Sequence, residues 1–132
     1  MAKKKQKSKL ERLAENKVCN KSYETTLSDC KLWFGVLNQE VFGGKLQPVD
    51  EIDIRRRTMA YAYYTCLNDT KNPDNNYTKL HMSNKYKNKW EFVETLAHEL
   101  VHHYQFLNDE PLNHGPTFYK WKDKLNRKGL SL

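Results

Sequence analysis

The sequence has no long apolar run. Nowhere in its 132 residues is there a segment near the ~20 consecutive apolar residues that a membrane-spanning helix requires. The basic opening MAKKKQKSK is not followed by the apolar segment of a secretory signal. We therefore expect a protein that is neither in a membrane nor secreted. The length, without an internal repeat, predicts one domain.

Cysteine is scarce as well. The three cysteines, Cys19, Cys30 and Cys66, are an odd number, widely spaced, and contain no C-x-x-C pair. This pattern argues against a disulfide framework and against a cysteine zinc site. We expect a reducing compartment, which is the cytoplasm, or the nucleus if the host is eukaryotic.

Positive charge is unevenly distributed along the chain. Residues 1–21 contain eight of the 23 Lys and Arg residues but two of the 16 Asp and Glu residues, so they carry +6 of the net +7. This composition predicts a tail over 1–21 that is disordered or loosely helical, followed by a domain over 22–132. The tail either confers solubility or attracts nucleic acid.

Apolar periodicity predicts the order of the elements. Gly43 and Gly44 are expected to end the first helix, and Pro116 to begin the last one. Segments with the helical period and segments that alternate polar with apolar residues follow one another in the sequence. They predict a helix over 23–42, strands over 51–55, 60–66 and 77–83, a helix over 90–107 and a helix over 116–128. We expect an α+β domain with an N-terminal helix, a small three-stranded sheet, a long helix over 90–107 and a C-terminal helix.

The stretch HELVHHYQFLNDEPLNHGPTFYKW, residues 98–121, holds four of the five histidines. His98 and His102 are four residues apart on the predicted helix, so their imidazoles lie one turn apart on the same side. At that spacing both can reach one zinc ion at ~2.0–2.1 Å. Glu99 follows the first histidine, the place of the general base in the H-E-x-x-H arrangement. The alternative is a solvated helix face with two histidines and a glutamate.

A third ligand has to come from the residues after this helix. The H-E-x-x-H-x-x-G-x-x-H pattern fails, because the chain has Gln105 and Asn108 where that pattern needs Gly and His. His114 is within reach, since the seven residues that lead to it can span ~23 Å and include residues that favour turns. Asp109 and Glu110 remain alternatives to His114.

The other two histidines are expected to have supporting roles. His103 points about 100° away from His102, so it either supports the ligands or lies at the surface. His81 lies in a predicted strand and is expected to be structural. The AYAYY segment at 60–64 is one source of a tyrosine that could donate to an oxyanion, although a place in the core and edge of the sheet explains these tyrosines better.

Three segments of the sequence resemble the SprT-like domain family, which includes the metalloprotease Spartan. These segments are LNQEVFGGKL (37–46), VETLAHELVHHYQF (93–106) and HGPTFYKW (114–121), and the likeness covers about 23–128. The resemblance implies a metalloprotease with one catalytic Zn²⁺ held by His98, His102 and His114, and with Glu99 as base. In the Spartan branch, it implies repair of DNA–protein crosslinks by cleavage of proteins bound to DNA.

Two points depart from the family pattern. The C-terminal zinc ribbon of many members is absent from this sequence, so we expect a minimal form of the domain. The gap between the second and third histidines is short compared with the eukaryotic members. The first departure removes one possible element for binding DNA or substrate, and the second leaves the choice of ligands unchanged.

Basic residues outside the histidine-rich stretch mark the expected contacts with nucleic acid. They cluster in the tail and near predicted strand ends, and Trp90 could stack on bases. We expect a monomer whose partners are protein substrates and DNA, the DNA single-stranded or bound without sequence preference. The residues assigned to nucleic acid are Lys3, Lys4, Lys5, Lys7, Lys9, Arg55, Arg56, Arg57, Lys85, Lys87 and Lys89.

Two other functions stay open at this point. One is a DNA-binding or adaptor protein that keeps zinc as a structural staple. Glu99 argues against this function, because a structural zinc site needs no base beside its ligands. The other is a peptidase of narrow specificity that is unrelated to DNA.

Overall fold

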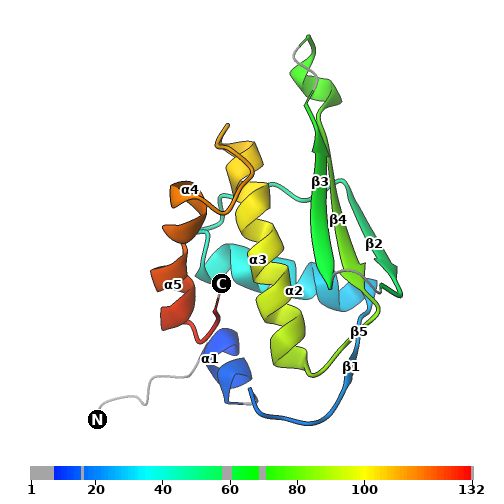
Figure 1. Ribbon diagram of the computed structural model, residues 1–132, viewed down its shortest axis with the longest axis vertical. Coiled ribbons are helices and arrows are strands. Elements are labelled where there is room, and N and C mark those ends of the chain that lie inside the picture. The colour runs from blue at the N-terminus through cyan, green and yellow to red at the C-terminus, as the bar shows by residue number, and fades with distance from the viewer. Residues whose placement is uncertain (1–7, 16, 58–60, 69–70, 132) are drawn as a thin grey trace, which may run out of the picture.

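The computed structural model describes residues 8–15, 17–57, 61–68 and 71–131, and its α+β class confirms the prediction (Figure 1). A single long helix, α3, runs between the sheet on one side and α4 and α5 on the other, with α2 crossing behind it. The elements are α1 (Lys9–Ala14), β1 (Tyr23–Glu24), α2 (Leu27–Glu40), β2 (Glu51–Arg55), β3 (Ala62–Leu67), a 3₁₀ turn (Pro73–Asn75), β4 (Tyr77–Ser83), β5 (Lys85–Tyr86), α3 (Lys89–Leu107), α4 (Pro116–Tyr119) and α5 (Lys122–Arg127).

The three predicted strands form one sheet in the order β2-β4-β3. The central strand β4 runs parallel to β2 and antiparallel to β3, and Leu80 lies opposite both Ile52 and Tyr64. Side chains alternate along β3, so Tyr64 is half-buried toward α3 while Tyr63 is exposed. The edge strand β3 is the strand that lies beside α3.

Helix α3 is held in place by its cap and by its apolar face. The Asn88 side chain accepts a hydrogen bond from the Glu91 N–H at 2.8 Å and thereby caps the helix. The same side chain donates to the carbonyls of Lys17 and Cys19, both at 3.0 Å. The residues on the buried face, each at most 1 % exposed, are Phe92, Val93, Leu96, Ala97, Leu100 and Val101. Because its N-terminus is capped and its apolar face is buried, α3 holds its histidines in fixed positions.

Helix α2 is shorter than the prediction of 23–42. Thr26 caps it through a hydrogen bond from the Asp29 N–H at 3.1 Å, and Tyr23 pairs in a strand with Tyr86 instead. The helix ends at Glu40, shortly before the two glycines that were expected to end it. Gly43 and Gly44 have positive φ angles of 64° and 76°. The short strands β1 and β5 are too small for a periodic pattern and were not predicted.

The last helix is divided in two, which corrects the prediction of one helix over 116–128. Between α4 and α5 the Trp121 N–H bonds to the Phe118 carbonyl, three residues back rather than four. The Trp121 ring packs against Phe42 and Tyr104, with centroids 4.7 and 4.8 Å away. Tertiary packing of this one ring therefore interrupts the helical hydrogen-bond ladder.

Part of the predicted tail is folded onto the domain. Helix α1 buries Leu10 and Leu13, which are 0 % and 5 % exposed, in the same core as α2 and α3. Residues 8–15 thus differ from the expectation of a loose tail, because two leucines one turn apart make α1 amphipathic. Residues 1–7 lie outside the described part of the chain. None of the described helices is long and apolar enough to cross a membrane.

Candidate metal centre

Three histidines converge beside α3. His98 and His102 come from that helix and His114 from the loop before α4, and one nitrogen of each lies within 4.8 Å of the others. The Nε2 atoms of His102 and His114 are 3.2 Å apart. Zinc with ~2.0–2.1 Å bonds places tetrahedral ligand atoms ~3.3 Å apart. The His102–His114 pair therefore has the spacing of two zinc ligands, and a nitrogen of His98 lies within 4.8 Å of both.

The loop after α3 turns back so that His114 reaches the helix. Asp109 takes a left-handed φ of 55°, and the Glu110 N–H then bonds to the Gln105 carbonyl at 2.8 Å. The Asn113 side chain accepts from the Gly115 N–H at 2.9 Å, which closes the chain just after His114. Glu110 is ion-paired with Lys120, and neither it nor Asp109 belongs to the histidine group.

Phe118 forms an apolar wall against all three imidazoles. Its ring is 2 % exposed, and its centroid lies 4.8 Å from His98, 5.2 Å from His102 and 4.6 Å from His114. Burial, followed by the neighbouring histidines, lowers the pKa of His98 to about 4, and burial also lowers the pKa of His102. Both rings are therefore neutral at pH 7, which is the form that binds a metal.

Glu99 is buried beside the first of these histidines in sequence. It is 7 % exposed, and burial raises the pKa of its carboxyl to about 7. A carboxyl that titrates near neutral pH exchanges protons readily at the working pH of most enzymes. The residue named from H-E-x-x-H thus has the protonation behaviour of a general base.

The alternative of a surface position for His103 is wrong. His103 is fully buried, and its Nε2 donates to the Gln47 carbonyl at 2.6 Å. Its Nδ1 must then accept from the Tyr64 hydroxyl, 2.8 Å away. His103 therefore ties α3 to β3 and to the loop after α2, directly behind the candidate metal centre.

His81 on β4 and the neighbouring tyrosines of β3 take part in packing within the sheet. His81 is buried, bonds to the Thr65 hydroxyl at 2.9 Å, and stacks on Tyr63 with ring centroids 3.9 Å apart. Since the hydroxyl of Tyr64 is held by His103, Tyr63 and Tyr64 both serve the sheet in this structure. The suggestion that this strand supplies an oxyanion donor gains no support from these two residues.

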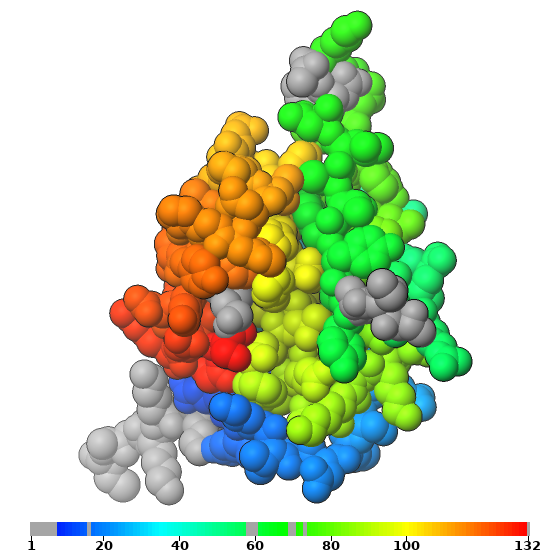
Figure 2. Space-filling model, viewed as in Figure 1, coloured from blue at the N-terminus to red at the C-terminus, as the bar shows by residue number. Residues whose placement is uncertain are grey.

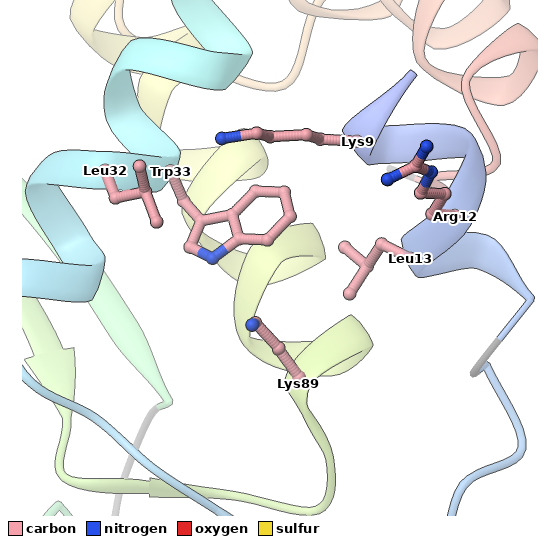
Figure 3. Close-up of a pocket in the computed structure, with 6 residues that line it drawn as sticks. All are labelled: Lys9, Arg12, Leu13, Leu32, Trp33 and Lys89. Carbon is pink, nitrogen blue, oxygen red and sulfur yellow. The ribbon is translucent and has the colours of Figure 1, made fainter. Parts of the chain in front are cut away.

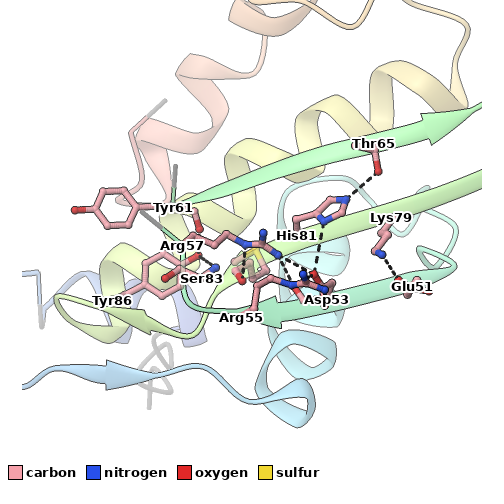
Figure 4. A network of polar contacts seen from close by, with 11 residues as sticks. Glu51, Asp53, Arg55, Arg57, Tyr61, Thr65, Lys79, His81, Ser83 and Tyr86 are labelled. Carbon is pink, nitrogen blue, oxygen red and sulfur yellow. Dashed lines mark hydrogen bonds and ion pairs between the residues drawn. The ribbon is translucent and has the colours of Figure 1, made fainter. Parts of the chain in front are cut away.

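Two of the residues predicted to contact nucleic acid form ion pairs with Asp53 (Figure 4). Arg55 and Arg57 contact its carboxylate at 2.7 and 3.0 Å. The Arg57 side chain is 9 % exposed and lies over the Tyr63 ring, 5.0 Å from its centroid. This position argues against Arg57 as a phosphate contact, because its guanidinium already has partners within the domain.

The other described basic residues line two separate hollows. Arg56, Lys85 and Lys87 line one of about 670 Å³. Lys9 and Lys89 line the other, of about 310 Å³, together with Arg12 and Trp33, residues that were not predicted (Figure 3). Four predicted lysines, Lys3, Lys4, Lys5 and Lys7, lie outside the described residues.

Trp90 was expected to offer a stacking face for bases. Its indole N–H donates to the Gly129 carbonyl at 3.0 Å, and its ring is half-buried against the core. The ring also lies under Lys17, whose Nζ is 5.2 Å from the centroid. Trp90 is therefore better described as part of the packing between α3 and the C-terminal segment.

Two residues around the histidines escaped the sequence reasoning. Phe118 lies within HGPTFYKW, and Gln105 stands where another zinc pattern needs glycine. Neither residue was predicted to contact the histidines. In the structure Gln105 is buried and its side-chain oxygen lies 2.8 Å from His102 Nδ1. The sequence carried no clear signal for this role, because the burial of Gln105, which makes its amide require partners, is visible only in the structure.

Comparison with known proteins gave one family match. The model of the SprT-like family matches residues 30–131. The matched segment begins within α2, ends after α5, and includes the three histidines and Glu99. A search of curated proteins found no match.

Proposed function

This chain belongs to the SprT-like family, and from that premise we propose that it is a zinc-dependent endopeptidase. The observation that carries the proposal is the convergence of His98, His102 and His114 within 4.8 Å. Among the described residues no fourth His, Cys, Asp or Glu joins this group. Structural zinc sites are closed by four protein ligands, whereas catalytic sites keep one position for water or substrate. The geometry therefore favours a catalytic ion over a structural staple.

The roles of the residues follow from their positions. When bound, zinc would polarise the scissile carbonyl and lower the pKa of the attacking water. The three imidazoles would hold the ion, with Phe118 packed against each ring. Glu99 accepts the proton of the attacking water and returns it to the leaving amine, for which a pKa of about 7 is well suited.

The edge strand β3 offers a place for an extended substrate. Among the described residues it pairs with β4 alone, and α3 lies beside it. In the space-filling view α3 forms a strip between β3 and the segment that leads to α4 (Figure 2). A peptide that adds to an exposed sheet edge gains main-chain hydrogen bonds without dependence on sequence. We infer that substrates lie along this strip.

Proteins bound or crosslinked to DNA are the substrates that the charge distribution supports best. Residues 1–21 carry a net +6, and the two hollows lined by Lys and Arg lie on the folded domain. Positive charge of this kind attracts phosphate backbones without reading sequence. Action in the cytoplasm or nucleus, where such substrates occur, belongs to the same proposal.

Metal analysis together with a cleavage assay tests the proposed function. Purified protein should contain one zinc per chain and should cleave an unstructured protein, and DNA should accelerate cleavage when the substrate also binds DNA. His114→Ala should lose the zinc and the activity, because two ligands hold the ion weakly. Asp109→Asn is the matched control from the same loop, since Asn also tolerates the left-handed conformation at that position.

The outcomes separate the ligand assignment from the function. If His114→Ala keeps one zinc per chain, the third ligand is another residue. If the wild-type protein binds no zinc, or binds it and cleaves nothing in the presence or absence of DNA, the proposed peptidase function is wrong.

A further inference from the structure

Gln105 connects two of the segments that carry the histidines. It is fully buried in α3, three residues after His102. Its side-chain oxygen lies 2.8 Å from His102 Nδ1. Its side-chain nitrogen donates to the Asn113 carbonyl and to the Thr117 hydroxyl, both at 3.0 Å. Asn113 and Thr117 stand on either side of His114 in the chain.

The orientation of this amide is determined by its partners. A backbone carbonyl can only accept, so the end of Gln105 that faces Asn113 must be the NH₂ group. The opposite end is then the carbonyl oxygen, and His102 must donate to it from Nδ1. The lone pair of His102 consequently lies on Nε2, the atom 3.2 Å from His114 Nε2.

We propose that Gln105 is a positioning residue that assembles the metal site before the metal arrives. One end of its amide holds His102 in the tautomer whose Nε2 can bind a metal. The other end anchors the loop on both sides of His114, so the second and third ligands are placed by the same side chain. This inference rests on the proposed function for the identity of the metal, whereas the tautomer and the loop contacts are properties of the protein alone.

The physical cost of losing this amide is specific. Without it, the His102 Nδ1–H and the Asn113 carbonyl both lose their hydrogen bond to Gln105, and His102 is no longer held in one tautomer. Hydrogen-bond partners of metal ligands typically change metal affinity by about 10–100-fold when removed. A residue that merely fills the core would affect stability without changing the histidine tautomer.

Two substitutions of Gln105 test the two ends of its side-chain amide separately. Gln105→Met keeps a similar volume and removes all three hydrogen bonds. Gln105→Glu keeps an acceptor for His102 but places a carboxylate against the Asn113 carbonyl, so it breaks the anchor of the loop. Thr117→Val removes one of the three bonds and leaves both His102 and Asn113 paired with Gln105. Thr65→Val is the matched control, because it removes the hydroxyl partner of His81, a histidine outside the metal group.

The measurements are zinc affinity and histidine tautomer. Zinc affinity is obtained by competition with a chromophoric chelator, and the His102 tautomer by long-range ¹H–¹⁵N correlation NMR of the metal-free protein. We expect the Nδ1–H tautomer in the wild type and a mixture in Gln105→Met, whose zinc affinity falls about 10–100-fold. Gln105→Glu should keep the tautomer and still bind zinc more weakly. Thr117→Val should keep the tautomer with a smaller loss of zinc affinity than Gln105→Met, and Thr65→Val should match the wild type.

Each remaining outcome is decisive. Wild-type His102 in the Nε2–H tautomer would overturn the proposal even if every Gln105 variant failed to fold. Unchanged zinc affinity in Gln105→Met would overturn it as well. A wild-type protein that binds no zinc would defeat the proposed function, and the NMR measurement would still decide the role of Gln105.

Discussion

Replacing Glu99 with glutamine distinguishes a general base from a bystander, and it has a second consequence for stability. Burial raises the pKa of Glu99 from its ordinary 4.5 to about 7. At about 1.4 kcal/mol for each pH unit, this rise corresponds to roughly 3 kcal/mol between the protonated and ionised forms. The folded metal-free protein therefore binds the Glu99 proton more tightly than the unfolded chain does.

The sign of the pH dependence follows from that difference. Between pH 4.5 and pH 7 the folded state holds more protons at Glu99, so the stability that this group contributes is lost as the pH rises through that range. Glutamine stays neutral at every pH. At pH 8, metal-free Glu99→Gln should be more stable than the wild type by up to roughly 3 kcal/mol, and the difference should shrink to near zero at pH 4.5.

Three measurements check this reasoning. Urea denaturation of the metal-free proteins at pH 4.5, 6 and 8 gives the stability difference. Zinc content should be unchanged, because Glu99 is not in the ligand group, and peptide cleavage should fall at least ~10²-fold. Glu94→Gln is the control on the same helix, since the Glu94 carboxylate bonds to Ser131, and it should retain cleavage.

Two results would refute the argument separately. If Glu99→Gln cleaves as fast as the wild type, Glu99 is not the base and the mechanism is wrong. If the two metal-free proteins have the same stability at pH 8 and at pH 4.5, the buried carboxylate does not carry the energetic cost assigned to it.

Two further predictions concern the N-terminal region. Leu10→Ala should lower the free energy of unfolding by about 2–5 kcal/mol, because Leu10 is fully buried, whereas Val18→Ala, at a residue that is 85 % exposed, should change it little; urea denaturation measures both, and equal values would remove α1 from the core. Deleting residues 2–7, which include four lysines, should weaken binding to single-stranded DNA and flatten the slope of log affinity against log salt by ~0.7 for each lost contact. Cleavage of a free peptide should survive this deletion, and identical salt slopes would assign these lysines to solubility; a longer deletion through residue 21 would also remove α1 and confuse the two effects.

Local order was largely predictable from the sequence. The strands at 51–55 and 77–83 were predicted with the bounds that the structure has, and α2 ends at Glu40, shortly before the glycines that were expected to end it. These features depend on neighbours within a few residues, through side-chain alternation and through the freedom of glycine at positive φ. The juxtaposition of His98 and His102 belongs to the same class, because one helical turn separates them.

The elements that the sequence did not predict are those decided by distant packing. The break between α4 and α5 depends on Trp121 packing against Phe42 and Tyr104, which come from other parts of the chain. The folded position of α1 depends on the core that receives Leu10 and Leu13. The lysine-rich composition of that segment predicted a loose tail, whereas its two leucines anchor α1 in the core.

What the sequence determined by itself was the chemistry: two imidazoles one turn apart, a carboxylate beside them, and one later histidine that could reach them. The tertiary structure decided how that chemistry is arranged, by turning the loop at Asp109, placing Phe118 against the three rings, and bonding Gln105 to both sides of the site. It also decided the partners of the basic residues, pairing Arg55 and Arg57 with Asp53 and placing others around two hollows. The physical reason is range. A helix imposes its spacing on residues four apart whatever surrounds it. His114 lies 12 residues after His102, and its placement depends on the turn at Asp109 and on the side-chain contacts of Gln105 across the loop.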